Sequence, residues 1–270
     1  SKGSFISTMV NALTNNKWES IPKENLQLGA ETFAYETGLY ETFRTLNHHP
    51  VFLEPHLDRL FNSAKLTQLK IEYTQQEIWE MIQEIIEKSP NPNQRVRILA
   101  VPKKLILYTS SLELNNLIYK GVSVITVQTN RVHPEIKTTD YRTCLTAWKS
   151  ANDSRCFEAI LIDKNGILFE GSRSNIFWII NKKLFTRKKD VLPGITRQTI
   201  INRSSFPVEF GILKKSGISK IDECFLTNSG SGIIPVTHFN GEKIGNGSVG
   251  EITNQLLKQY NEWMVQDIDG

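Results

Sequence analysis

Apolar positions recur along the chain with two different periods, which predicts a mixture of β-strands and amphipathic helices. Short runs rich in aromatic and β-branched residues predict strands at 37–46, 51–53, 95–101, 105–109, 122–127, 159–163, 167–170, 176–180, 183–186 and 223–227. Apolar residues at helical spacing predict helices at 55–69, from Thr74 to the Pro-rich break at 89–93, at 140–150, from Gly194 onward and at 252–260. This mixture predicts an α+β fold with two sheets.

Local signals support this pattern. Thr74 and Glu77 form a candidate capping box, in which the Thr74 hydroxyl caps an early helix N–H and Glu77 reaches back. Asn165 and Gly166 lie between two predicted strands and favour the positive φ angles of a tight hairpin turn. The stretch 110–120 is a candidate connection between two domains.

The composition is that of an ordinary globular protein. The chain has 270 residues, of which 39% are hydrophobic and 22% are charged. Its net charge of +4 gives little support to binding of nucleic acids or membrane surfaces. Cys144, Cys156 and Cys224 show no CxxC spacing, so we expect reduced thiols and a cytoplasmic location. The sequence has neither an apolar run of the ~20 residues that a membrane span needs nor a signal-peptide core at 1–10.

The histidines do not form a metal-binding pattern. His48 and His49 are adjacent, His56 and His133 stand alone, and no HExxH motif occurs. We therefore expect exposed loop histidines and no metal ion. The sequence also lacks the GxSxG elbow of serine hydrolases and the GxxxxGK[ST] loop of nucleotide-binding proteins.

Two segments rich in small residues are candidate anion sites. In the first, 192–197, a glycine turn precedes a helix start, where free N–H groups, the helix dipole and the Thr196 hydroxyl suit a phosphate. The second, 227–232, follows a strand and could present N–H groups and hydroxyls. Each alone is more often an ordinary turn, but together they indicate a phosphate-bearing ligand. Glu170, at a strand end, either faces solvent or pairs with a ring nitrogen, and spacing does not decide between these alternatives.

A set of stretches, in order along the chain, matches a known family. They are GLYETFR at 38–44, EPHLDRL at 54–60 with Ser63 and Ala64, IKTTDY at 136–141, FEAIL at 157–161, EGSRSNIF at 170–177, LPGITR at 192–197 and NSGSGIIPV at 228–236. From about Tyr35 to Gly241 the chain thereby resembles the fold-type IV pyridoxal phosphate (PLP) enzymes, also called class IV aminotransferases. This family includes branched-chain aminotransferases, D-amino acid aminotransferases and 4-amino-4-deoxychorismate lyases.

The resemblance implies a role for each matching position. Lys137 is expected to be the Schiff-base lysine and Glu170 the partner of the pyridine nitrogen. Arg59 is expected to bind the phosphate, and Tyr141 to reach the phenolic oxygen of the cofactor. The remaining cofactor-binding residues that the resemblance implies are Ser174, Asn175, Ile195, Thr196 and Ser229.

The chemistry explains these residue types. A lysine amine attacks only when it is deprotonated, and burial beside a cationic cofactor lowers its pKa. The released lysine then acts as a general base at the substrate Cα. A carboxylate beside the pyridine nitrogen keeps that nitrogen protonated and strengthens the electron sink. An arginine offers a bidentate fork to a dianionic phosphate.

Within the family, the substrate-side residues favour a lyase. Glu41, Thr42 and Arg44 resemble the lyases, as does the loop 228–236, whereas branched-chain aminotransferases usually carry Gly in place of Thr42. We therefore expect conversion of 4-amino-4-deoxychorismate to 4-aminobenzoate and pyruvate, a step in folate biosynthesis. Thr42, Arg44 and Arg97 are candidate substrate-binding residues because this substrate has two carboxylates. An equally good interpretation places both arginines at the protein surface.

Two alternatives stay open. A branched-chain or D-amino acid aminotransferase would use the same residues, and a degenerate PLP-binding protein would lack catalysis. The intact set of Lys137, Glu170 and Arg59 argues against the degenerate protein. The family's Gly-Asp pair before Gly38 is replaced by Glu36 and Thr37 here, a change on the substrate side.

The resemblance also implies an architecture. It predicts a small N-terminal α/β domain at 1–115, a linker at 116–120, and a larger, barrel-like C-terminal α/β domain at 121–270 that carries Lys137. PLP is expected at the junction of these domains. A homodimer, in which a loop of the partner completes the pocket, is expected as well.

Overall fold

The computed structural model describes residues 8–28, 38–130 and 134–270. The chain divides into two compact units. The N-terminal unit comprises residues 1–112 and 136–142, and the C-terminal unit comprises 113–135 and 143–270. The segment that carries Lys137 is thus grouped with the N-terminal unit, and the domain boundaries expected around 116–120 stay a prediction. Glu36, Thr37 and His133 lie outside the described residues.

The N-terminal unit is built on a six-stranded antiparallel sheet with the strand order β2-β1-β6-β5-β3-β4. The strands are β1 Met9–Thr14, β2 Lys17–Pro22, β3 Leu39–Leu46, β4 His49–Pro50, β5 Gln94–Val101 and β6 Lys104–Ser111. The sequence analysis missed β1 and β2. Because β2 is an exposed edge strand, its sequence lacks the apolar alternation that predicts a half-buried strand.

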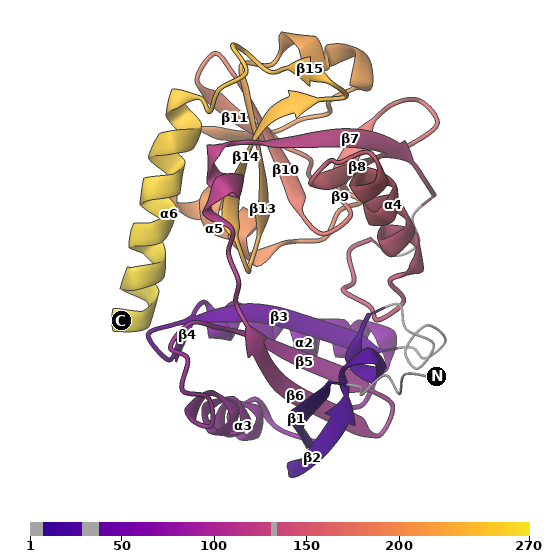
Figure 1. Ribbon diagram of the computed structural model, residues 1–270, viewed down its shortest axis with the longest axis vertical. Helices are drawn as coiled ribbons and strands as arrows, with labels where there is room; N and C mark the ends of the chain where they lie inside the picture. The colour runs from indigo at the N-terminus through magenta and orange to yellow at the C-terminus, as the bar shows by residue number, and fades with distance from the viewer. Residues whose placement is uncertain (1–7, 29–37, 131–133) are drawn as a thin grey trace, which may run out of the picture. The chain divides into compact units, whose positions relative to one another are not determined.

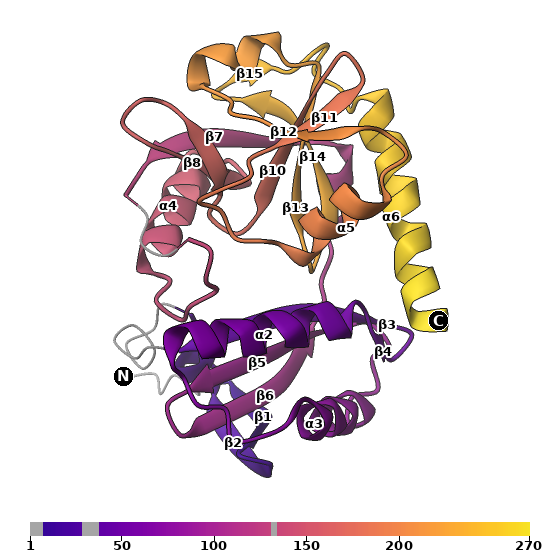
Figure 2. The same cartoon turned by 180° about the vertical axis from the view of Figure 1, so that it is seen from behind.

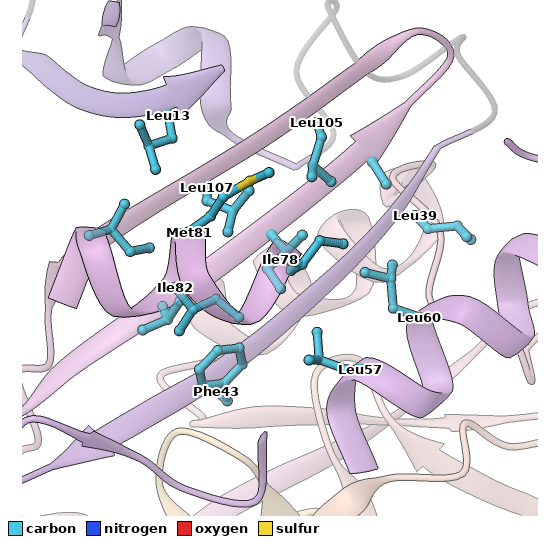
Figure 3. Close-up of a cluster of buried hydrophobic side chains, with 14 of the residues drawn as sticks. Leu13, Leu39, Phe43, Leu57, Leu60, Ile78, Met81, Ile82, Leu105 and Leu107 are labelled. Carbon is cyan, nitrogen blue, oxygen red and sulfur yellow. The ribbon is translucent and has the colours of Figure 1, made fainter. Parts of the chain in front are cut away.

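Two helices, α2 (Leu53–Thr67) and α3 (Gln75–Glu87), cover one face of this sheet (Figures 1 and 2). Their apolar faces pack against alternate residues of the strands, which gives the core shown in Figure 3. The capping box at Thr74 is confirmed, because its hydroxyl accepts the Glu77 N–H and the Glu77 carboxylate accepts the Thr74 N–H, both at 3.1 Å. A 3-10 helix, η1 (Lys23–Leu26), follows β2.

The strand predicted at 51–53 is wrong. β4 ends at Pro50, Phe52 adopts a left-handed conformation with φ of 52°, and α2 begins at Leu53. Val51 and Phe52 are apolar because they are buried in the core, at 3% and 8% exposure. An apolar run of three residues shows burial but does not by itself distinguish a strand from a helix entry.

The C-terminal unit is built on a nine-stranded mixed sheet with the order β12-β11-β10-β13-β14-β7-β8-β9, and β15 pairs with β14. The strands are β7 Val122–Gln128, β8 Glu158–Ile162, β9 Leu168–Gly171, β10 Asn175–Ile180, β11 Lys183–Thr186, β12 Val208–Phe210, β13 Glu223–Asn228, β14 Gly232–Phe239 and β15 Glu242–Lys243. Three pairs are parallel: β7 with β8, β7 with β14, and β11 with β12. The expected α+β architecture with two sheets, the larger of them curled, is confirmed.

The helices of this part of the chain are α4 Arg142–Asp153, α5 Ile195–Arg203 and α6 Glu251–Asp269, with the 3-10 helices η2 Asn116–Lys120 and η3 Lys215–Lys220. Helix α6 packs along β13 and β14 (Figure 1). The Glu223 carboxylate accepts the N–H groups of Ile252 and Thr253, at 3.3 and 2.8 Å, and so caps the first turn of α6.

The sequence analysis also missed β14, which contains Pro235. A proline inside a strand argues against a central strand because it lacks an N–H group. Here β14 pairs with β7 only from Val236 onward, so at Pro235 the side toward β7 is not yet paired. Within the described residues no helix is long and apolar enough to cross a membrane. The cytoplasmic location stays a prediction.

Candidate active site

Glu170 is buried at the end of β9 and is tied to the loop before α5. Its Oε2 accepts a hydrogen bond from the N–H of Leu192 at 2.7 Å and one from the side-chain amide of Asn175 at 3.5 Å. The same amide donates to the carbonyl of Leu192 at 2.9 Å. Burial lowers the pKa of Arg197, and the negative charge of nearby Glu170 offsets part of this shift. The structure thus brings Glu170 and Asn175 into one network.

The first turn of α5 lies beside the turn that joins β13 and β14. Gly194 is the N-cap residue of α5 and has no side chain to cap it, so the N–H groups of Ile195 and Thr196 have no partner within the helix. The Thr196 hydroxyl donates to the carbonyl of Asn228 at 3.1 Å, and Ser229 follows directly. The structure therefore brings Ile195, Thr196 and Ser229 together, where N–H groups, hydroxyls and the positive end of a helix dipole suit an anion.

Thr227 adds a buried polar atom to this region. It lies directly opposite Asn175 on the neighbouring strand and is 1% exposed. Its hydroxyl has no hydrogen-bond partner among the described residues. Leaving such a group unsatisfied costs about 1–3 kcal/mol, so a ligand or water that satisfied it would be favoured. The sequence analysis included Thr227 in the candidate anion segment 227–232 but gave it no role of its own.

Ser174 is held by a buried carboxylate to which the sequence analysis gave no role. Glu158, at the start of β8, is 2% exposed and accepts hydrogen bonds of 2.8, 3.2 and 3.1 Å from the N–H groups of Ala159, Ser172 and Arg173. The hydroxyls of Ser172 and Ser174 also donate to it, the latter at 2.9 Å. These hydrogen bonds together fix the turn between β9 and β10. The hydroxyl hydrogen of Ser174 is donated to Glu158.

Lys137 lies beside β3 in the N-terminal unit. Its carbonyl accepts the N–H of Tyr40 at 3.1 Å, and Thr138 forms an isolated antiparallel bridge with Leu39. The Lys137 Nζ lies 4.4 Å from the centre of the Tyr40 ring. The negative face of a tyrosine ring attracts a cation at this distance. Tyr141, four residues further on, is buried.

Arg59, on α2, pairs with a buried carboxylate. Its Nε and Nη2 donate to the two oxygens of Glu41 at 2.9 and 2.6 Å, and His56 Nδ1 lies 2.7 Å from Glu41 Oε1. Burial alone would raise the pKa of Glu41, but the charge of Arg59 and the hydrogen bonds outweigh it and lower the pKa to about 2. Burial also lowers the pKa of His56, against the effect of Glu41. A neutral His56 therefore donates its Nδ1 hydrogen to an ionised Glu41.

Arg97 is held above the opposite face of the same sheet. Its Nε donates to the Thr42 hydroxyl at 3.1 Å, and its guanidinium carbon lies 5.6 Å from the centre of the Tyr40 ring. Thr42 and Arg97 are directly opposite on β3 and β5, and Arg44 is opposite Arg95 in the same register. Since side chains alternate along β3, Tyr40, Thr42 and Arg44 lie on the face away from α2.

The expected cofactor residues are distributed over both units. Lys137, Arg59 and Tyr141 belong to the N-terminal unit, and Glu170, Ser174, Asn175, Ile195, Thr196 and Ser229 belong to the C-terminal unit. The sequence analysis named Glu41 only as a residue that resembles the lyases and gave it no part in holding Arg59. The signal was available, because Glu41 lies between Leu39 and Phe43 at a core-facing position of a strand. The expectation that His56 is an exposed loop histidine is wrong, because His56 is 1% exposed and lies on α2.

Comparison with known proteins decides the family. Residues 38–239 match the family described as "Amino-transferase class IV". The chain belongs to this family. It is 28% identical to a putative branched-chain-amino-acid aminotransferase of Methanocaldococcus jannaschii over 254 residues, which covers 84% of this chain and 87% of the relative. It is 27% identical to a D-alanine aminotransferase of Listeria monocytogenes serotype 4b (strain F2365) over 280 residues, which covers 94% and 96% of the two chains.

Solved structures of this class share the fold. The branched-chain amino acid aminotransferase of Escherichia coli superimposes with a TM-score of 0.81 at 21% identity, covering 95% of this chain and 95% of that one. A related branched-chain amino acid aminotransferase has been solved with pyridoxamine 5'-phosphate, the aminated form of PLP, and also superimposes with a TM-score of 0.81. Class IV aminotransferases are PLP-dependent enzymes, and PLP is the cofactor of this chain. The C-terminal unit fits such a group: it offers the buried carboxylate of Glu170, the open first turn of α5 and the orphaned hydroxyl of Thr227.

Proposed function

We propose that this class IV aminotransferase transfers the amino group of an α-amino acid to a 2-oxo acid. The observation that carries the proposal is the similarity to relatives named as branched-chain and D-alanine aminotransferases, which covers most of both chains. The chemical groups of the candidate site are consistent with this reaction. They include an amine, a buried carboxylate and an anion cradle, all of which amino-group transfer through PLP requires.

We further propose that both groups of residues serve one PLP molecule. Arg59 would bind the phosphate through its guanidinium, together with the N–H groups of Ile195 and Thr196 and the hydroxyl of Ser229. Glu170 would hold a proton at the pyridine nitrogen, and Asn175 would orient Glu170. Tyr141 and Ser174 complete the proposed set. When bound, PLP supplies an aldehyde that takes up the amino group and a ring that accepts electrons from Cα.

Lys137 is the proposed general base. Its Nζ would remove the proton from the substrate Cα and, in a transaminase, return it to the cofactor carbon. The ring of Tyr40 lies against this amine at 4.4 Å and limits where Nζ can move. A lysine held in this way delivers its proton from a defined position.

Arg97 is the proposed anchor for a substrate carboxylate, with Thr42 and Arg44 beside it. Lys137 Nζ and the Arg97 guanidinium carbon lie 4.4 and 5.6 Å from the same Tyr40 ring centre, so these two cations are within about 10 Å of each other. Since the Nε of Arg97 is held by Thr42, the other N–H groups of its fork are directed away from that hydroxyl. An amino acid with its amine at Lys137 could thus place a carboxylate at Arg97.

A lyase is the second candidate. Glu41, Thr42 and Arg44, with the loop 228–236, resemble 4-amino-4-deoxychorismate lyases, and two carboxylates on the substrate would match Arg44 and Arg97. In that reaction Lys137 would remove the Cα proton, and pyruvate would leave as the ring aromatises to 4-aminobenzoate. No amino acceptor would be needed.

Paired assays test the two functions. The purified protein is incubated with each of a panel of branched-chain L-amino acids and D-alanine, with 2-oxoglutarate or pyruvate as acceptor, and the new amino acid is measured by chromatography. In parallel it is incubated with 4-amino-4-deoxychorismate alone, and 4-aminobenzoate is measured. We expect turnover in the first assay. Turnover in the second assay alone would overturn the transaminase and establish the lyase, and Lys137→Ala should be inactive in both.

A homodimer is also proposed. Several large apolar side chains of the N-terminal unit are exposed, among them Met9, Trp18, Leu66 and Trp79. Exposed apolar surface of this kind is common where subunits associate. Sedimentation equilibrium of the purified protein should give the mass of two chains. A mass of one chain would contradict the proposed homodimer.

A further inference from the structure

Glu41 lies in a row of core residues where an apolar side chain would be less costly to bury. Along β3, Leu39 and Phe43 are 1% and 0% exposed on the face that α2 covers, and Glu41 between them is 1% exposed. Taking a carboxylate out of water carries a large desolvation penalty, and a buried ion pair often stabilises a fold less than apolar residues of similar volume. Stability alone therefore does not account for this pair.

The geometry of the pair restricts Arg59 strongly. Two parallel hydrogen bonds, from Nε to Oε2 at 2.9 Å and from Nη2 to Oε1 at 2.6 Å, hold one edge of the guanidinium plane against the carboxylate. Such a bidentate pair fixes the orientation of the plane as well as its distance. The N–H groups of Nη1 and the second hydrogen of Nη2 point away from Glu41. Contacts within the protein thus fix the orientation of Arg59.

His56 supports the carboxylate from the preceding turn of α2. Its Nδ1 lies 2.7 Å from Glu41 Oε1, and its ring lies 5.4 Å from the ring of Phe43, centre to centre. Oε1 therefore takes part in bonds with both His56 and Arg59. Because all three side chains belong to the N-terminal unit, the network is present in that unit by itself.

We propose that Glu41 is a positioning residue that orients Arg59 toward the cofactor phosphate, and that His56 holds Glu41 in place. This inference rests on the proposed function, in which Arg59 binds the phosphate. A free arginine side chain loses rotamer entropy when it binds a ligand, and an arginine that is already ordered loses less. The negative charge of Glu41 acts in the opposite direction, since it repels a phosphate. We infer that the orienting effect is the larger one, because the charge of Glu41 is already paired with Arg59.

Comparison of two ligands, with and without the phosphate, measures how much the phosphate group contributes to binding. Apoprotein is titrated with PLP and with pyridoxal, which lacks the phosphate, and the dissociation constants are measured by absorbance. The proteins compared are the wild type, Glu41→Gln, Arg59→Lys and the double variant. Glu54→Gln, at an exposed position of α2, the helix that carries Arg59, is the control. We expect Glu41→Gln to raise the dissociation constant of PLP about tenfold and that of pyridoxal less than about twofold. The double variant should be no weaker than Arg59→Lys, because the two residues act as a unit.

Each outcome separates this inference from the proposed function. If Arg59→Lys leaves the preference for PLP over pyridoxal unchanged, Arg59 does not bind the phosphate and the proposed cofactor set is wrong. If Arg59→Lys weakens PLP but Glu41→Gln leaves it unchanged or tightens it, the positioning role alone is overturned. Equal losses for both ligands would make Glu41 a purely structural residue. Should Glu41→Gln fail to fold by circular dichroism, Glu41→Asp, which keeps the charge, makes the same comparison with a smaller expected loss.

Discussion

Lys137 and Tyr40 are joined twice, by a 3.1 Å hydrogen bond from the Tyr40 N–H to the Lys137 carbonyl and by the 4.4 Å approach of the Lys137 Nζ to the Tyr40 ring. The residues are far apart in the sequence, yet both the backbone and the side chain of the lysine are held by β3. The position of the amine is therefore set by the first long strand of the N-terminal sheet, which also carries Glu41 and Thr42.

We expect Lys137 to be the residue that PLP modifies. After reduction of the PLP-loaded protein with borohydride, mass spectrometry should find the cofactor mass on the peptide that contains Lys137. Lys137→Ala should give no adduct, whereas Lys149→Ala, at an exposed position of α4, should label normally. An adduct on a different lysine of the wild type would show that the assignment is wrong.

Replacing Arg97 should weaken substrate binding more than the chemical step. Because Arg97→Gln removes the proposed charge-assisted contact to a substrate carboxylate, we expect KM to rise about ten- to hundredfold while kcat changes less. Thr42→Val keeps the arginine but removes its hydrogen bond, so its effect should be smaller. Steady-state kinetics with the best substrate measure KM and kcat of both variants. Arg203→Gln, at an exposed position, is the control. An unchanged KM for Arg97→Gln would remove this residue from the substrate site.

Glu158→Gln should destabilise the C-terminal unit. The carboxylate accepts hydrogen bonds from three N–H groups and two hydroxyls, and an amide in its place would turn an NH2 group toward some of these donors. We expect a loss of about 2–4 kcal/mol in the free energy of unfolding. Urea unfolding followed by circular dichroism measures it, and Glu242→Gln, at an exposed position, should be close to the wild type.

The pair of Glu41 and Arg59 should make the N-terminal unit sensitive to acid. The pKa of Glu41 falls from 4.5 to about 2 on folding, so the unfolded chain binds the proton more readily. The stability that this shift contributes is fully present above pH 4.5 and is lost as the pH falls toward 2; it is on the order of 3 kcal/mol. His56, whose pKa is also lowered, acts in the same direction. Urea midpoints between pH 6 and pH 2 should fall less steeply in Glu41→Gln than in the wild type.

Gly194→Ala should weaken cofactor binding while leaving the fold intact. A Cβ at this position would overlap the side-chain oxygen of Asn175, which lies in the Glu170 network. Because α5 starts here, the shift should also move the N–H groups of its first turn. We expect the dissociation constant of PLP to rise at least about tenfold with little change in circular dichroism. Gly241→Ala serves as a control for glycine replacement, since its Cβ would meet no neighbour, although its positive φ adds strain.

Much of the local structure was predictable from the sequence because it depends on near neighbours. The capping box of Thr74 and Glu77 is a contact over three residues, and the helical spacing of α3 shows its buried face directly. Elements with weak local signals were missed. The edge strand β2 is polar because it is exposed, and β14 contains Pro235, whose tolerance depends on where β7 begins to pair.

The sequence by itself determined the family and supplied the candidate site residues, since an ordered set of motifs from Gly38 to Val236 needs no coordinates to be compared. It did not determine which side chains meet. Glu41 contacts Arg59, and Glu158 contacts Ser174, only because strand pairing and helix packing close long loops between them. Periodicity tells which face of an element is buried but not which element covers it, and strand order and register are properties of the whole sheet. For that reason the network that holds Arg59, the proposed phosphate-binding residue, became visible only in the tertiary structure.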